Sequence, residues 1–193
     1  GVNREMTRES LDIILRLWSE TEPFEHKGKF WTVKAPAEMY GFLKPHIKPL
    51  QRPHPPIGVA GLSKGSDTLK LAGERGYWPM SLNLNPGYVA SHWEAVEMGA
   101  ARSGRVADRG QWRMVREVFV ADTDAEAMRL SAGSHMGRMM REYFLKLLGE
   151  FDFLQYLKHD PNIANSDVTP EYCAKHNWIV GSPATCAEKI EKI

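Results

Sequence analysis

The sequence predicts an α/β protein whose parallel strands form half of a (β/α)8 barrel. Between residues 57 and 193, short apolar runs alternate four times with segments of helical periodicity. Successive strand-helix units favour a parallel sheet with right-handed crossovers. A complete barrel needs about 250 residues, which exceeds the 193 residues of this chain. An open doubly wound sheet is the competing architecture, because the number of strands alone does not distinguish the two.

Residues 1–56 are expected to form a helix, a small hairpin and a proline-rich loop. Four apolar residues share one helical face at spacings of three and four: Leu11, Ile14, Leu15 and Trp18. Thr7 is the predicted N-cap of this helix. Residues 26–33 place Gly28 before an aromatic and β-branched run, which is typical of a hairpin. Residues 34–56 hold six of the twelve prolines, so an extended loop is expected there.

The first two strand-helix units begin at Ile57 and are bounded by recognisable caps. Ile57–Ala60 is a short apolar run, and the helical pattern of 68–75 ends at a glycine. The second unit is a strand over 78–84 and a helix over 86–101, with Asn85 as its N-cap. Both units predict a strand that leads directly into a helix.

The third and fourth units complete the predicted half barrel. Residues 112–121 are predicted to form one strand, and Thr123–Glu126 has the sequence of a capping box that starts a long helix toward Leu148. Residues 178–180 form the fourth predicted strand, and Ser182 starts the last helix. Residues 57–193 therefore hold four strand-helix units, and the whole chain is predicted to be one partial barrel domain.

Charge and apolar content exclude several classes of partner. The chain has 25 Lys and Arg against 24 Asp and Glu, so neither nucleic acid nor an anionic membrane surface is an expected partner. The longest apolar runs, such as 57–62, fall far below the ~20 residues of a membrane helix. Two separated cysteines and no signal-peptide pattern predict a soluble, cytoplasmic protein. Because the chain starts at Gly1 and stops inside a helical pattern, we expect a fragment of a longer protein.

The loop after the first barrel strand is the strongest candidate for a binding site. Its residues are Gly61, Leu62, Ser63, Lys64, Gly65 and Ser66. Glycines permit close backbone approach, the serines and the lysine offer donors and charge, and a helix N-terminus adds unpaired N–H groups that favour phosphate. An ordinary capped strand-helix loop is the alternative interpretation. The spacing matches neither GxGxxG nor a P-loop.

Other candidates are weaker. Residues 181–185 also join a strand to a helix, where Ser182 is expected to act as a cap, while Met80, Ser81 and Asn83 lie near the end of the second strand. The seven histidines and two cysteines lack the spacing of a metal site, so no metal is expected. No catalytic residue is assigned, although His135 or His159 could join a site assembled in space.

An apolar stripe runs along the predicted long helix. Its members are Met136, Met139, Met140, Tyr143, Phe144, Leu147 and Leu148. The pattern favours a core or subunit contact, and the wall of a substrate pocket is the alternative.

Six blocks in their order along the chain resemble the second half of the bacterial luciferase-like flavin monooxygenases. They are residues 10–18, 24–31, 49–57, 72–76, 118–127 and 181–183. The entry to the 112–121 strand and residues 81–93 are similar to the limonene and alkane monooxygenase branch. The resemblance covers nearly the whole chain and identifies it as the C-terminal half of such a TIM barrel.

The resemblance implies a flavoprotein that oxygenates a small organic substrate with reduced FMN and O2. It also implies a separate flavin reductase as partner, and often a homodimer. Gly61–Ser66 matches the family loop that holds the FMN phosphate, although it is one residue longer and has Leu62-Ser63 in place of an acidic-Ser pair. The family's first four strands, with a candidate catalytic histidine, have no counterpart here, so the isolated fragment is expected to be inactive. A deazaflavin F420-dependent oxidoreductase of the same fold and a non-catalytic flavin-binding module are the alternatives.

Overall fold

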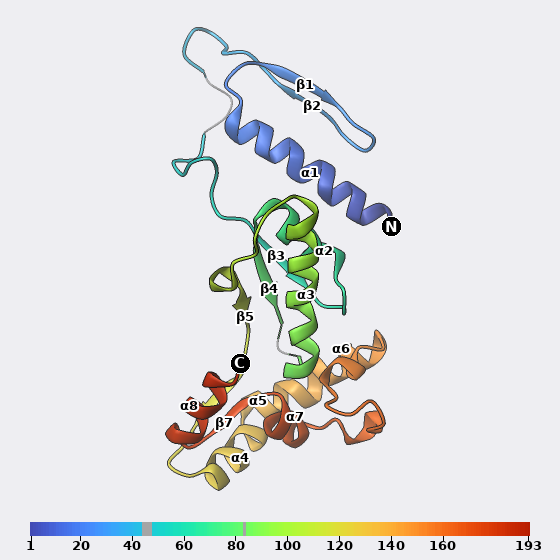
Figure 1. Ribbon diagram of the computed structural model, residues 1–193, viewed down its shortest axis with the longest axis vertical. Helices are drawn as coiled ribbons and strands as arrows, with labels where there is room; N and C mark the ends of the chain where they lie inside the picture. The colour runs from blue at the N-terminus through green and yellow to red at the C-terminus, as the bar shows by residue number, and fades with distance from the viewer. Residues whose placement is uncertain (44–47, 83) are drawn as a thin grey trace. The chain divides into compact units, whose positions relative to one another are not determined.

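Short parallel strands, most of which are followed by a helix, build the chain from residue 58 onward. The computed structural model describes residues 1–43, 48–82 and 84–193. Strand β3 (Gly58–Gly61) pairs in parallel with β4 (Trp78–Ser81), and β4 pairs in parallel with β5 (Arg113–Met114) (Figure 1). Strand β6 (Val118–Val120) pairs in parallel with β7 (Ile179–Gly181). The prediction of an α/β protein with parallel strands is confirmed.

The helices that follow the strands start and end at the predicted kinds of cap. They are α2 (Asp67–Arg75), α3 (Pro86–Arg102), α4 (Asp124–Gly133) and α8 (Pro183–Glu191). Gly76 ends α2 in the left-handed region at φ 71°, where a residue without Cβ is favoured. Asn85 caps α3 by accepting from the backbone N–H of Gly87 at 3.0 Å, and Thr123 and Ser182 cap α4 and α8.

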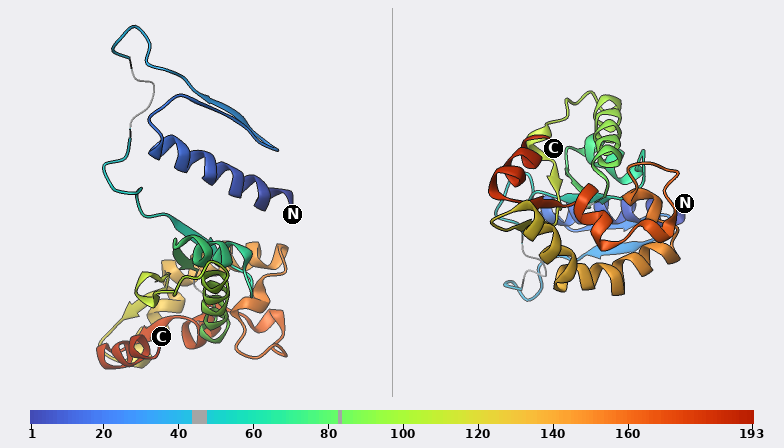
Figure 2. Two further views of the ribbon diagram at one scale, coloured as in Figure 1. Left: turned by 45° about the horizontal axis from the view of Figure 1, so that its top comes forward. Right: turned by 90° about the horizontal axis from the view of Figure 1, so that it is seen from below.

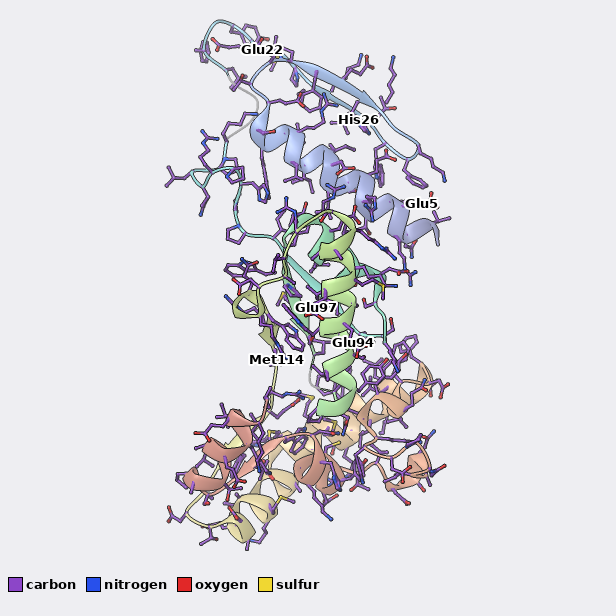
Figure 3. All side chains as sticks on the ribbon, viewed as in Figure 1. Glu5, Glu22, His26, Glu94, Glu97 and Met114 are labelled. Carbon is purple, nitrogen blue, oxygen red and sulfur yellow. The ribbon has the colours of Figure 1, made fainter. Side chains whose placement is uncertain are left out.

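Residues 1–57 form one compact unit and residues 58–193 another, and each is described by itself. In the first unit, α1 (Val2–Ser19) accompanies a hairpin of β1 (Phe24–Lys27) and β2 (Thr32–Ala35), as predicted. The Glu9 carboxylate of α1 accepts hydrogen bonds from the backbone N–H groups of the hairpin turn, 29–31, at 2.9 to 3.2 Å. Figure 3 labels His26 on this hairpin and Glu5 on α1. The Glu9 carboxylate thus joins the hairpin to the helix.

The first unit differs from one expectation, the N-cap of its helix, and the structure describes only part of another, the loop of 34–56. The prediction that Thr7 is the N-cap is wrong, because the helix begins at Val2 and the Thr7 hydroxyl donates to the carbonyl of Asn3 within it. Threonine in a helix interior commonly bonds back in this way. The predicted loop of 34–56 falls partly on residues 44–47, which lie outside the described residues.

The predicted single strand of 112–121 is wrong, because this segment changes partner along its length. Strand β5 follows β4, and the N–H of Val115 still donates to the carbonyl of Ser81. Two residues later the carbonyl of Glu117 accepts from Ile179, and β6 then pairs with β7. The segment is therefore two short strands in two sheets. Hydrophobic pattern alone does not specify such a change of partner.

The predicted long helix toward Leu148 is also wrong. Ser134 is extended (ψ −169°) and caps a new helix by accepting from Met136, so α4 ends and α5 (His135–Met139) begins. A π-helical turn (Met140–Phe144) and α6 (Leu145–Glu150) continue the chain. Helix α7 (Pro170–His176), capped by Thr169, precedes β7 and was not anticipated. The apolar stripe divides: Met140 is buried, whereas Met139 and Tyr143 are about half exposed.

Helices α2 and α3 pack with their backbones in direct contact. A Cβ built on Gly73 would collide with the carbonyl oxygen of Val96, and one on Gly99 with the carbonyl of Lys70. The two helices remain adjacent in both views of Figure 2. Only glycine permits this distance between helix axes, so the two positions set how α3 lies on α2.

Helices cover one face of strands β4 and β6 and leave the other face open. Pro79 and Ser81 of β4 are buried on the side of α2 and α3, whereas Met80 between them is 38% exposed. In β6, Phe119 packs on the main core, while Val118 and Val120 are each 50% exposed. This alternation is the signature of a sheet with helices on a single face. An open apolar face therefore remains on β4 and β6, whereas β7 is buried along its whole length.

We predict that Gly99→Ala destabilises the protein by about 1–3 kcal/mol, because the added methyl forces the two helix backbones apart. Gly133→Ala is the matched control, since a Cβ there meets nothing within 4 Å at the end of α4. Helix propensity favours Ala by roughly 0.5–1 kcal/mol at such a site. Urea unfolding followed by circular dichroism measures both, and equal effects would contradict the close contact of α2 and α3.

Candidate functional site

The loop Gly61–Ser66 lies at the carboxyl end of β3 and the N-terminus of α2. Gly61 is buried as the last residue of the strand, and a Cβ on it would collide with Leu69. The N–H of Ser66 donates to the carbonyl of Ser63 at 3.1 Å, which closes a turn. Gly65 takes φ +63° with open space around it. The loop is a tight turn that presents its tip to solvent at a helix N-terminus.

The two serines of the loop have different roles. Ser66 is 5% exposed, and its Oγ accepts from the N–H of Leu69 and bonds the Thr68 hydroxyl at 2.8 Å. Thr68 in turn donates to the carbonyl of Ala60 at 2.7 Å, which ties the helix start to β3. Ser66 is therefore a cap whose hydroxyl is already engaged. Ser63, Lys64 and Gly65 are exposed and form the face that a ligand can reach.

Helix α3 holds the loop from one side. The N–H of Lys64 donates to the phenol oxygen of Tyr88 at 2.5 Å. Tyr88 also packs against Tyr156 with ring centroids 4.6 Å apart. Burial raises the pKa of Tyr88, and this effect outweighs the hydrogen bond from Lys64, so the phenol is neutral at physiological pH. The tip of the loop is thus anchored by an uncharged acceptor.

A chain of hydrogen bonds through the buried side chains of His92 and Ser81 also reaches this loop. The Nε2 of His92 lies 3.2 Å from the carbonyl oxygen of Leu62, and its Nδ1 lies 2.9 Å from Ser81 Oγ. The indole N–H of Trp112 donates to the same Oγ at 2.9 Å. His92 and Ser81 are fully buried. Sequence reasoning missed His92 as a site residue, because its partners are 11 and 30 residues away and no local spacing marks them.

The other candidate loop, 181–185, is bound by an anion of the chain itself, the carboxylate of Asp124 on α4. The Asp124 carboxylate accepts from the N–H of Ser182 at 2.6 Å and from the hydroxyl of Thr185 at 3.0 Å. These bonds, first that from the Ser182 backbone and then that from Thr185, lower the pKa of Asp124. The carboxylate occupies the place at the start of α8 where a phosphate would bind. This loop is a junction between helices, and Ser182 acts as its cap as expected.

The remaining candidates separate into buried and exposed groups. Met80 lies on the open face of the sheet and Ser81 on the covered face, while Asn83 lies outside the described residues. His135 is exposed. His159 stacks on His176 with centroids 4.0 Å apart and bonds the Tyr172 hydroxyl.

Both cysteines are buried and free. Burial raises the pKa of Cys173 to about 12, so its thiol stays protonated. Within residues 1–43, 48–82 and 84–193, the structure contains no group of three or more His, Cys, Asp or Glu side chains with the arrangement of a metal site. Over the same residues, no helix has both the length and the apolar character needed to cross a bilayer.

Comparison with known proteins finds close relatives over the whole chain. The chain is 32% identical to 3,6-diketocamphane 1,6-monooxygenase of Pseudomonas putida over 195 residues, and 31% identical to 2,5-diketocamphane 1,2-monooxygenase 1 of the same organism over 207 residues. These alignments cover 98% and 100% of this chain but 51% and 55% of the relatives. The chain therefore spans about half the length of the curated relatives it matches.

Solved structures agree with this result. The oxygenating constituent of 3,6-diketocamphane monooxygenase, a type II Baeyer-Villiger monooxygenase from Pseudomonas putida in complex with FMN, matches with a TM-score of 0.84 and 32% identity. That match covers 98% of this chain and 52% of the other. The monooxygenase RslO1 from Streptomyces bottropensis matches with a TM-score of 0.66, covers 98% and 50% of the two chains, and at 22% identity indicates the fold alone.

The finer resemblance to the limonene and alkane monooxygenase branch stays a prediction. The family resemblance itself was carried by six ordered blocks, and a family model described as luciferase-like monooxygenase matches residues 2–193. This chain belongs to the luciferase-like monooxygenase family.

Proposed function

We propose that the protein containing this chain is an FMN-dependent monooxygenase that uses reduced FMN and O2 to oxygenate a small organic substrate. The relative with the FMN complex supports this proposal, since it is 32% identical over 98% of the chain. The observation in this chain that carries the proposal is the open N-terminus of α2, next to the exposed Ser63, Lys64 and Gly65. Reduced FMN, when bound, supplies the electrons that activate O2.

The loop Gly61–Ser66 fits a phosphate group on three counts. Its tip is unobstructed at Gly65, Lys64 supplies a positive charge, and the positive end of the dipole of a nine-residue helix lies next to the loop. The comparable position at α8 is already taken by Asp124. Ser63, Lys64 and Gly65 are therefore the proposed phosphate ligands, while Gly61, Leu62 and Ser66 shape the loop.

The chain is also proposed to be the C-terminal half of a (β/α)8 barrel. Three strands lie in chain order, β3-β4-β5, and their open face carries Met80 and, in the second sheet, Val118 and Val120. The inner side chains of a barrel strand normally fill a packed core. We infer that the remaining half of the protein covers this face. The flavin ring, the organic substrate and O2 would then meet at the strand ends, with catalytic groups from that other half.

A separate flavin reductase and a homodimer are further parts of the proposal. One relative is described as the oxygenating constituent of its monooxygenase, which supports a second component that delivers reduced flavin to it. Cofactor titration distinguishes this proposal from its two alternatives, an F420-dependent oxidoreductase and a non-catalytic flavin-binding module.

The overall proposal is tested by adding reduced FMN to the full-length protein and measuring O2 consumption with diketocamphanes as probes, which the relatives' names suggest. We expect tight FMN binding and O2 consumption that depends on an organic substrate. Binding of F420 in place of FMN would favour the hydride-transferring alternative, and flavin binding without turnover on a broad ketone panel would favour the module.

Lys64→Ala is expected to weaken FMN binding roughly tenfold, because one charge-assisted hydrogen bond to the phosphate is lost. Binding of riboflavin, which lacks the phosphate, should not change. Lys189→Ala, beside the 181–185 loop, is the matched control and should leave both affinities unchanged. Fluorescence titration measures the two affinities, and an equal loss for FMN and riboflavin would argue against phosphate binding at this loop.

Val120→Asp should destabilise the full-length protein by several kcal/mol, since an unpaired carboxylate would be buried under the missing half. Val106→Asp is the control, because Val106 is 96% exposed on a surface loop. Thermal unfolding compares the two variants. Similar small shifts for both would show that the open face is not a barrel interior.

A further inference from the structure

We propose that His92 is a positioning residue that holds the carbonyl of Leu62, and with it the shape of the Gly61–Ser66 loop, through a buried hydrogen-bond chain to Ser81 and Trp112. This inference rests on the proposed role of that loop as a phosphate site. It adds a determinant of cofactor binding that lies outside the loop, on helix α3 and at the ends of β4 and β5.

The donors and acceptors of the chain have one consistent arrangement. The indole of Trp112 can only donate, so Ser81 Oγ accepts from it. The carbonyl of Leu62 can only accept, so Nε2 of His92 carries a proton. Nδ1 is then the acceptor for the Ser81 hydroxyl proton. Every polar atom of the chain is satisfied when His92 is neutral.

Burial makes this arrangement strict. His92 and Ser81 are both fully buried, so no water replaces a lost partner. Burial is the larger effect and lowers the pKa of His92, whereas the hydrogen bond to the Leu62 carbonyl raises it. The imidazole is therefore neutral at physiological pH. The tautomer is therefore set by its neighbours, and the ring delivers one N–H donor to Leu62.

The far end of the chain is held rigidly. Trp112 stacks on Trp93 with centroids 5.5 Å apart and an interplanar angle of 28°, and the Arg109 guanidinium lies over both rings. The indole N–H of Trp93 donates to the carboxylate of Glu97 at 2.8 Å. Figure 3 labels Glu97 on α3 and Met114 on β5, the strand that follows Trp112. Ser81 thus connects the loop to a fixed aromatic pair.

Other hydrogen bonds hold the two ends of the loop, but the one from His92 acts on the carbonyl of Leu62. Lys64 is held through its N–H by Tyr88, and the turn closes through Ser63 and Ser66. Leu62 lies between the strand end and that turn, so the direction of its carbonyl decides which way the following N–H groups point. Without a donor at His92, this carbonyl would lose its partner on α3, and the peptide would turn to find another.

The experiment compares FMN with riboflavin in the full-length protein. His92→Leu is expected to lower the ratio of FMN to riboflavin affinity at least fivefold, whereas His92→Gln, whose amide N–H can reach Leu62, should recover most of it. A purely structural role would weaken both ligands equally and would not be rescued by Gln.

Two further variants keep the test decisive if His92→Leu does not fold. Ser81→Ala and Trp112→Phe each remove one bond of the chain and should lower the same ratio by a smaller factor. Ser131→Ala is the matched control, since Ser131 is fully buried and its hydroxyl donates to the carbonyl of Met128 in its own helix. An unchanged ratio in Ser81→Ala and Trp112→Phe would overturn the proposal.

The readout also separates two failures. If the unaltered protein does not prefer FMN to riboflavin, or Lys64→Ala leaves the preference intact, the phosphate role of the loop is wrong. If Lys64→Ala removes the preference while the variants at His92, Ser81 and Trp112 keep it, the positioning role of His92 alone is wrong.

Discussion

The backbone contact of α2 with α3 at Gly73 and Gly99 is the constraint on which the candidate site depends. It brings α3 close enough for two of its side chains to reach the loop that precedes α2. Tyr88 accepts from the N–H of Lys64, and His92 bonds the carbonyl of Leu62. Side chains larger than hydrogen at either glycine would move α3 away from the loop. A packing requirement between two helices therefore supports the geometry of a loop at the other end of α2.

The N-termini of helices α2 and α8 illustrate how similar local sequences acquire different roles. Both α2 and α8 follow a parallel strand and begin with a serine cap. The positive dipole end at each helix start favours an anion. At α8 the anion is Asp124 of the chain itself, which joins α4 to α8. At α2 the helix start lies next to the exposed Ser63, Lys64 and Gly65, and there we propose an external phosphate as the ligand.

The open face of the strands connects the fold to the proposed function. Half-exposed valines on β6 and a partly buried phenylalanine between them, packed on the core, are expected of a strand with helices on one side only. The relatives are about twice as long as this chain. A second half that covers this face would close the barrel and bring further groups to the strand ends, where Gly61 and Ser81 already lie.

Local sequence determined the kind and order of most elements. Caps at Asn85, Thr123 and Ser182 and the apolar runs before them act within a few residues, so hydrophobic period and cap chemistry were enough to predict them. The order of the six blocks along the chain was also enough to recognise the family that the comparison confirms. Tertiary structure decided what local patterns do not contain: the change of strand partner between Val115 and Glu117, the break at Ser134, and the links from His92 to Leu62 and from Asp124 to Ser182. Those links join residues 30 and 58 positions apart, and only the packing of helices on strands brings them within hydrogen-bonding distance.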